Sequence, residues 1–205
     1  MIGRKTLVRK FRAAVLFFCA GAVIGTLCDS LHVLNGVEIY PEFEGYPFMF
    51  RSGQPFWVPI LMGSATVVIA WMHLWTDRWL REGYARVLPG YRSLRWWLPG
   101  LGFAIAAWLG SGFLPLQGLV TDLVLASAGL FLWASLDRTP PGLLQAGLTA
   151  IGGVLVEGFL SDVGAFGYAP LAQGPWGVPS WLPWIYFGFS PVIGGLARRL
   201  VRKKE

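Results

Sequence analysis

The chain has 205 residues, of which 55% are hydrophobic and only 14% are charged, whereas about 25% of the residues in a soluble globular domain are charged. This composition excludes an ordinary soluble domain. The net charge of +6 lies in short basic blocks between apolar stretches, which indicates membrane topology rather than nucleic-acid binding. Cys19 and Cys28 provide neither a disulfide framework nor the spacing of a metal site.

Six apolar stretches follow one another along the chain, and each is long enough to cross a hydrocarbon core of roughly 30 Å as a helix. The last one shows the pattern most clearly, with aromatic residues from Trp181, an uncharged middle, and Arg198 and Arg199 near its end. We predict an all-α integral membrane protein, a single domain over residues 1–205. Its six transmembrane helices are predicted at residues 13–34, 55–76, 96–114, 116–136, 143–164 and 179–197.

The basic residues indicate the orientation of these helices. With six crossings, the N-terminal leader, the group from Arg78 to Arg95, Arg138 and the C-terminal tail all fall on one side, and only Arg51 falls on the other. Cytoplasmic loops carry the excess of lysine and arginine, so we predict that both termini are cytoplasmic. The membrane would be the inner membrane of a bacterium, or the endoplasmic reticulum if the source is eukaryotic.

Ionisable residues inside apolar spans are costly and point to function. Glu157 lies near the middle of the fifth predicted span, and Asp122 lies about two turns into the fourth. Four ionisable residues fall toward the side opposite the basic termini and could meet in one pocket: Asp29, His32, Asp122 and Asp162. Pairing of Asp29 with His32 at the interface is the simpler alternative.

Known enzyme motifs are absent from the sequence. It contains no HExxH, no GxSxG, no P-loop and no paired histidine ligands. We therefore predict no catalytic residue, no metal site and no cofactor other than a bound lipid.

Three stretches of the chain carry a family resemblance. They are Phe56-Trp57-Val58-Pro59 with Gly63, then Leu132-Trp133 through Asp137-Arg138-Thr139 to Gly142, and finally Trp181-Leu182-Pro183 through Gly194-Gly195 to Arg198-Arg199-Leu200. In this order, and on three of six spans, they resemble the Insig family of polytopic membrane proteins, which regulate sterol synthesis in animals. The resemblance covers roughly residues 54–201 and is weakest in the third span.

The resemblance implies a six-helix bundle with a lipid pocket inside the membrane. In animals that pocket receives oxysterols, and the protein then retains partner membrane proteins in the endoplasmic reticulum. Asp137 occupies the position of the family's aspartate for partner binding, and Thr121 lies near the family's sterol-facing glutamine. Asp122 and Glu157 are departures from the family pattern, because each adds a carboxyl group.

From these features we predict a protein that binds an amphipathic lipid of the sterol or diacylglycerol type. The predicted lipid-binding residues are Thr121, Asp122 and Glu157 for the head and Trp57 and Trp133 for the apolar walls. Asp137 and Arg138 are predicted to bind partner membrane proteins, and Asp137→Ala is expected to leave folding intact. Assembly into a homo-oligomer is a further expectation, and nucleic acid is not an expected partner.

Two alternatives remain open at this point. The first is a membrane isomerase, cyclase or hydratase that acts on an isoprenoid lipid with Asp122 and Glu157 as acid and base. The second is a transporter, which would require an inverted repeat and a broken helix. The chain shows no repeat, although Pro183 and Pro191 could interrupt the last span.

Overall fold

The computed structural model describes residues 4–41, 50, 53–80, 94–114, 118–174 and 176–201, and within them the prediction of an all-α bundle is confirmed. The six described helices and two short strands are, in chain order, α1 (Arg4–Leu34), β1 (Glu38–Ile39), α2 (Trp57–Trp79), α4 (Leu94–Ser111), α5 (Leu119–Leu136), α6 (Pro140–Asp162), β2 (Gly167–Tyr168) and α7 (Leu182–Val201).

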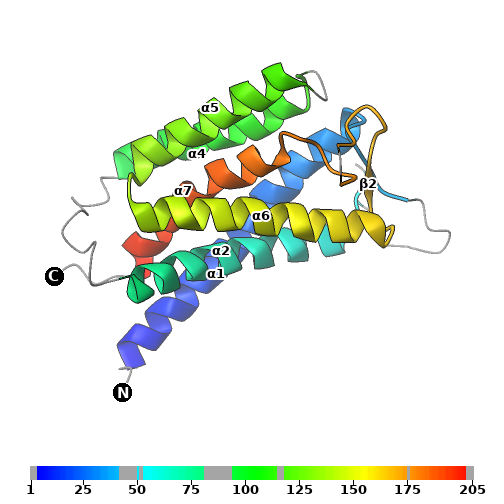
Figure 1. The fold of residues 1–205 in the computed structure, drawn as a ribbon. Coiled ribbons are helices and arrows are strands. Elements are labelled where there is room, and N and C mark those ends of the chain that lie inside the picture. The colour runs from blue at the N-terminus through cyan, green and yellow to red at the C-terminus, as the bar shows by residue number, and fades with distance from the viewer. Residues whose placement is uncertain are drawn as a thin grey trace.

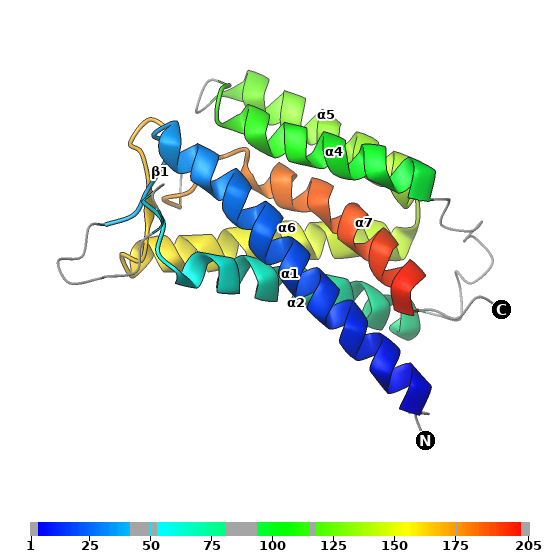
Figure 2. The same ribbon diagram turned by 180° about the vertical axis from the view of Figure 1, so that it is seen from behind.

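Helix α7 forms the centre of the bundle. It packs against α1, α2, α4, α5 and α6, with α4 and α5 along one side and α1 and α2 along the other (Figures 1 and 2). Its buried positions run from Leu182 to Val201, and a helix buried on most sides needs apolar or small residues all round. The stretch that shows the membrane pattern most clearly in the sequence is therefore also the core of the fold.

Four described helices are long and apolar enough to cross a membrane: the segment Leu7–Leu34 of α1, α2, α5 and α6. The apolar part of α4, Trp97–Ser111, is shorter. Many large apolar side chains of these helices point away from the core, such as Leu123 on α5 and Leu155 on α6. A bundle of this kind buries its outer apolar surface in lipid instead of in protein.

The helix ends lie within four residues of the predicted ones, with one exception. Helix α1 starts at Arg4 rather than at residue 13, because arginine, lysine and leucine are good helix formers and nothing in the basic leader breaks a helix. At 1.5 Å per residue, its 31 residues span about 46 Å, so α1 is longer than a hydrocarbon core. The start of α1 and the end of α7 lie at the same end of the bundle (Figure 2).

We call the opposite end of the bundle the outer end, and there a two-stranded sheet joins two distant loops. Strand β1 pairs antiparallel with β2, with Glu38 opposite Tyr168 and Ile39 opposite Gly167. The sequence did not predict these strands. Their effect is to hold the chain after α1 against the chain after α6 (Figure 1).

Candidate functional site

A small hollow lies inside the bundle where α4, α5 and α7 meet. Its lining is apolar, and half of it consists of small residues: Ala104, Ala107, Ala128, Gly129 and Gly188. A side chain on Gly129 would come within 3.1 Å of the Trp184 carbonyl oxygen, so glycine allows the backbones of α5 and α7 to approach closely there. The hollow holds about 200 Å³ of empty space, its open mouth included.

The buried face of α5 continues from the hollow toward the outer end. Thr121, Leu125, Gly129 and Leu132 are the buried residues of this helix, and such spacing places them on one face. Thr121 is fully buried and lies one turn beyond Leu125, which lines the hollow. A polar side chain therefore lies close to the outer limit of an otherwise apolar space.

Asp122 lies in the first turn of α5, not two turns into a helix as predicted, because Gly118, at φ 135°, precedes a helix that starts only at Leu119. Its carboxylate accepts a hydrogen bond of 2.9 Å from the Ser180 hydroxyl. A carboxylate is stabilised at a helix N-terminus by the free backbone N–H groups and the helix dipole. This position explains how an apolar span accommodates Asp122.

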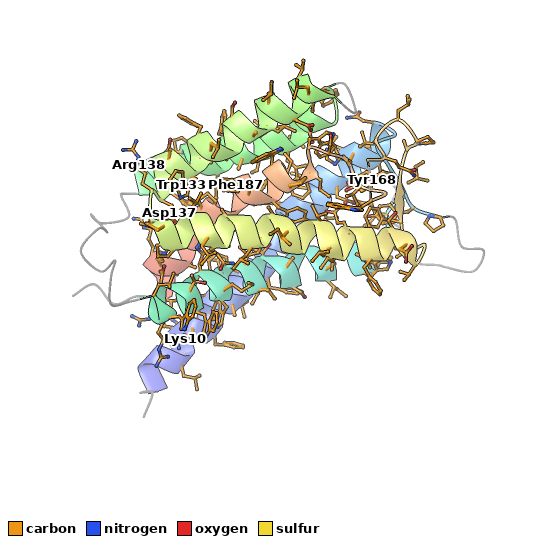
Figure 3. The ribbon with its side chains drawn as sticks, in the orientation of Figure 1. Lys10, Trp133, Asp137, Arg138, Tyr168 and Phe187 are labelled. Atoms are coloured by element: carbon orange, nitrogen blue, oxygen red, sulfur yellow. The ribbon has the colours of Figure 1, made fainter. Side chains whose placement is uncertain are left out.

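Glu157 has different partners, on the other side of α7. Its carboxylate accepts hydrogen bonds from the hydroxyls of Tyr168 on β2 and Tyr186 on α7. Gly153, one turn before Glu157, leaves room for the Tyr186 ring, since an added Cβ would lie 2.4 Å from it. Tyr168 lies at the outer end of the bundle (Figure 3).

The two tryptophans predicted as pocket walls lie far apart along the bundle. The Trp57 ring packs edge-on against Tyr40, with the ring centroids 5.8 Å apart. Trp133 donates its indole N–H to the Thr139 carbonyl oxygen at 3.3 Å and packs near Phe187 (Figure 3). Neither residue is among those that line the hollow.

The end of the bundle that holds the termini contains a buried ionic bridge. Arg198 of α7 donates to both carboxylate oxygens of Asp77 on α2, at 2.6 and 2.8 Å. It also donates to Asp137, in the turn between α5 and α6, at 2.7 Å. Arg198 is 2% exposed and the Asp137 side chain is fully buried. This ionic bridge therefore joins three segments that are distant in sequence.

Asp137 also organises the turn that contains it. Its carboxylate accepts from the Thr139 backbone N–H at 3.2 Å and from the Thr139 hydroxyl, and Thr139 in turn caps α6 by accepting from the Gly142 N–H at 3.1 Å. Arg138 adopts φ 56° and is exposed, at the same end as Asp137 (Figure 3). Of the two predicted partner-binding residues, only Arg138 lies on the surface.

A buried polar network follows the interface of α2, α6 and α7 inward from this bridge. His73 contacts the Ser190 hydroxyl at 2.8 Å, Ser190 contacts Thr149 at 3.1 Å, and Thr76 donates to Gln145 at 2.9 Å. Gly194 makes room for the His73 ring, which would lie 2.4 Å from an added Cβ. These contacts link the three helices within the apolar bundle.

The outer end holds a second cluster, formed by Asp29, His32, Glu38, Tyr40 and Gln54. Asp29 accepts hydrogen bonds from Tyr40, at 3.1 Å, and from Gln54. His32 contacts Glu38 at 3.2 Å and the Ser111 hydroxyl at 3.0 Å. Burial, followed by the charge of Asp29, raises the pKa of Glu38 well above its usual value.

Comparison with known proteins decides the family. An INSIG protein homolog from Mycolicibacterium vanbaalenii is 31% identical to this chain over 193 residues, which cover 93% of this chain and 88% of that relative. The chain belongs to the Insig family. The insulin-induced gene 1 proteins of Danio rerio and Homo sapiens are each 25% identical, over 92% and 94% of this chain and 72% and 66% of those proteins. No protein-family model matches the chain.

Solved structures agree with this assignment. The crystal structure of the mycobacterial Insig homolog MvINS matches the present one with a TM-score of 0.78 and 27% identity, over 95% of this chain and 97% of that one. A cross-linked MvINS trimer matches with the same values. This Insig protein is therefore an integral, multi-pass membrane protein, as its apolar helices predict.

The four ionisable residues predicted on the outer side of this Insig chain do not form one pocket. Asp29 and His32 belong to the same cluster but have different partners there. Asp122 is tied to Ser180, and Asp162 is exposed at the end of α6. Sequence reasoning grouped them by depth in the membrane alone, which says nothing about the side of the bundle on which a residue lies.

Sequence reasoning missed the hollow itself. None of its small lining residues, such as Ala104, Ala107 and Ala128, was singled out from the sequence. The detectable signal was the coincidence of Ala128-Gly129 in one span with Gly188 in another, since small residues mark close helix approach in membranes. Nothing in the sequence indicated which helices these residues would bring together.

Proposed function

We propose that this Insig family protein binds an amphipathic lipid of the sterol or diacylglycerol type at the hollow between α4, α5 and α7. The apolar lining, with its concentration of alanine and glycine, supports this proposal most directly. Lipid-sized ligands need concave, mainly apolar sites with a few polar groups that fix orientation. Thr121, at the outer limit of this face of α5, and its neighbour Asp122 in the first turn would receive the hydroxylated head.

The size of the hollow adds a condition to the proposal. Without its open mouth the hollow has room for only about 10 Å³, far below the 300–1,000 Å³ of typical ligand pockets, so a whole lipid requires the three helices to separate. Opening would cost few polar contacts at the hollow, because the indole N–H of Trp184 is the one polar side-chain group among its lining residues. Contributions from Glu157, Trp57 and Trp133 stay predictions, since those residues lie outside the hollow.

A regulatory rather than catalytic role follows from the same proposal. Lipid occupancy would move α7, which lines the hollow through Gly188 and carries Arg198 at its far end. The turn at Asp137 and Arg138 would then present a different surface to partner membrane proteins, with Arg138 in direct contact and Asp137 acting through Arg198. The enzyme alternative gains no support, because Asp122 and Glu157 are bound to separate partners.

The experiment that tests lipid binding is native mass spectrometry with lipid extraction, on protein purified from its own membranes. We expect one stoichiometric lipid per chain in the wild type and its loss in Ala107→Leu, which fills the hollow. Ala106→Leu is the matched control, because Ala106 is exposed on the same helix and should keep the lipid. Absence of a retained lipid in the wild type, or its retention in Ala107→Leu, would contradict the proposal.

The same spectra report the oligomeric state. The relative MvINS has been crystallised as a cross-linked trimer, and we propose that this chain also forms a homo-oligomer. A mass of three chains would support a trimer. A mass of one chain under conditions that preserve bound lipid would contradict it.

A further inference from the structure

The outer end of the bundle holds three carboxyl groups from three different elements, two of them buried and that of Glu157 half-buried. They are Asp29 of α1, Glu38 of β1 and Glu157 of α6, and the charges of Asp29 and Glu157 both act on Glu38. Asp29 is 3% exposed and Glu38 is 6% exposed. Burying one unpaired carboxylate is already costly, and neighbouring carboxylates in addition repel one another. If all three of these carboxyl groups were ionised, their repulsion would therefore push β1 away from the bundle.

The polar neighbours of these carboxyls are almost all neutral. Asp29 accepts from Tyr40 and Gln54, and Glu157 accepts from Tyr168 and Tyr186. Within the described part of the chain, His32 is the one side chain able to carry a positive charge that forms an ion pair in this cluster. A single imidazole cannot balance three carboxylates.

Glu38 is the carboxyl with the least compensation. Its Oε1 atom lies 3.2 Å from His32 Nδ1, while its Oε2 atom is buried and has no hydrogen-bond partner. An ionised oxygen in that position would lose its hydration without replacement. A proton on the Glu38 carboxyl removes the charge and supplies a donor toward its neighbours.

A proton fits this cluster better than a metal ion. Across residues 4–41, 53–80, 94–114, 118–174 and 176–201, no group of three His, Cys, Asp or Glu side chains could hold a metal. The carboxylate oxygens instead face the hydroxyl groups of tyrosines. Burial raises the pKa values of Tyr40 and Tyr168, so both phenols stay protonated and act as donors.

We infer that Asp29, Glu38 and Glu157 form a proton-binding site, and that the bound proton holds the paired strands β1 and β2 closed over the outer end of the bundle. Glu38 is part of β1 and Tyr168 is part of β2, and the two residues lie opposite each other in the strand pair. When the two strands separate from the bundle, Glu38 leaves the cluster and regains water. Closure and proton binding are thereby linked.

The sign of the linkage follows from the pKa of Glu38. Burial and the two neighbouring charges raise the pKa of Glu38 well above its ordinary value of 4.5 in the closed form, while the open, hydrated form titrates near that ordinary value. The closed form therefore binds the proton more tightly. The proton's contribution to closure is fully present below the ordinary pKa of Glu38 and is lost as the pH rises through its raised pKa. For one proton, the equilibrium constant for closure falls by up to tenfold per pH unit.

Hydrogen exchange on the full-length protein in lipid nanodiscs, followed by mass spectrometry between pH 5 and pH 9, tests this inference. After correction for the intrinsic pH dependence of exchange, the opening constant of residues 37–40 and 167–169 should rise with pH, by up to tenfold per unit. Helical amides of α5 should not change. In Glu38→Gln the strand pair should open to nearly the same extent at every pH.

Matched variants make the test specific. Asp162→Asn removes an exposed carboxyl at the outer end of α6 and should behave like the wild type. Arg51 lies outside the described residues, and in Arg51→Gln the opening constant should still rise with pH. If that rise is lost, an arginine neutralises the cluster, which overturns the inference. An unchanged rise in Glu38→Gln overturns it as well.

A second variant covers the case in which Glu38→Gln does not fold. Asp29→Asn removes one of the repelling charges while its side-chain oxygen can still accept from Tyr40. The opening constant should then rise over a narrower pH range than in the wild type, and its total increase should be smaller. A rise identical to that of the wild type would show that these carboxyls do not share the proton.

Discussion

At the scale of single residues, two adjacent glycines of α6 have opposite environments. A Cβ on Gly153 would lie 2.4 Å from the Tyr186 ring, whereas one on Gly152 would meet nothing within 4 Å. Overpacking destabilises a fold by about 1–3 kcal/mol. In a helix interior, alanine is more stable than glycine by about 1 kcal/mol. We therefore expect Gly153→Ala to lower the melting temperature in detergent and Gly152→Ala to raise it or leave it unchanged.

The same pair also separates packing from a general effect of helix propensity. Tyr186 donates to Glu157, so displacement of its ring would disturb that contact too. If Gly153→Ala melts at or above the wild-type temperature, the Tyr186 ring is free to move and the close packing of α6 on α7 is not required for stability.

Residue partners were the least predictable part of this structure. Arg198 belonged to a basic tail when only its sequence neighbours were considered, and the structure buries it between Asp77 and Asp137. Glu157 was predicted to be functional because of its depth, but its tyrosine donors come from β2 and α7. Neither case was accessible from the sequence, because a hydrogen-bond partner depends on which helices become neighbours.

At the scale of elements, the positions of the helices were largely predictable and the short strands were not. An uncharged run of about 20 residues has few alternatives in a bilayer, because every backbone group must be hydrogen-bonded internally. The β1–β2 pair involves only two residues from each strand, too few for an alternating pattern. Its position depends on the packing of loops whose composition allows many conformations.

The turn between α5 and α6 is the element whose stability the structure explains best. Asp137→Ala would remove one of two carboxylates from buried Arg198 and two contacts to Thr139. Breaking a buried ion pair by removing one partner costs about 3–5 kcal/mol, so we expect a clear loss of thermal stability. The sequence-based expectation that Asp137→Ala leaves folding intact does not fit this geometry.

Arg138→Ala provides the control at the same turn, since Arg138 is exposed and lies outside the ionic bridge. Its melting temperature should match that of the wild type. If Asp137→Ala also melts at the wild-type temperature, the ionic bridge contributes little to stability. A direct role of Asp137 in partner binding would then be the better explanation of its position.

At the scale of the whole molecule, α7 connects the two ends of the bundle. Its outer half contacts Glu157 through Tyr186 and lines the hollow through Gly188, and its inner half carries Arg198. Pro191 lies inside this helix, where it removes one backbone hydrogen bond and allows a bend. Under the proposed function, a lipid in the hollow would change the bend of α7 at Pro191 and so shift the inner half that carries Arg198.

Orientation in the membrane is the remaining prediction at this scale. In a variant with both native cysteines replaced by alanine, a cysteine at Arg138 and one at Leu171 would mark opposite ends of the bundle, since both positions are exposed. The excess of basic residues at the end that holds the termini favours a cytoplasmic location. In intact cells, a membrane-impermeant maleimide should therefore label Leu171→Cys at once and Arg138→Cys only after permeabilisation. The reverse order would place both termini outside, against the charge distribution, and labelling of both variants in intact cells would require molecules of mixed orientation.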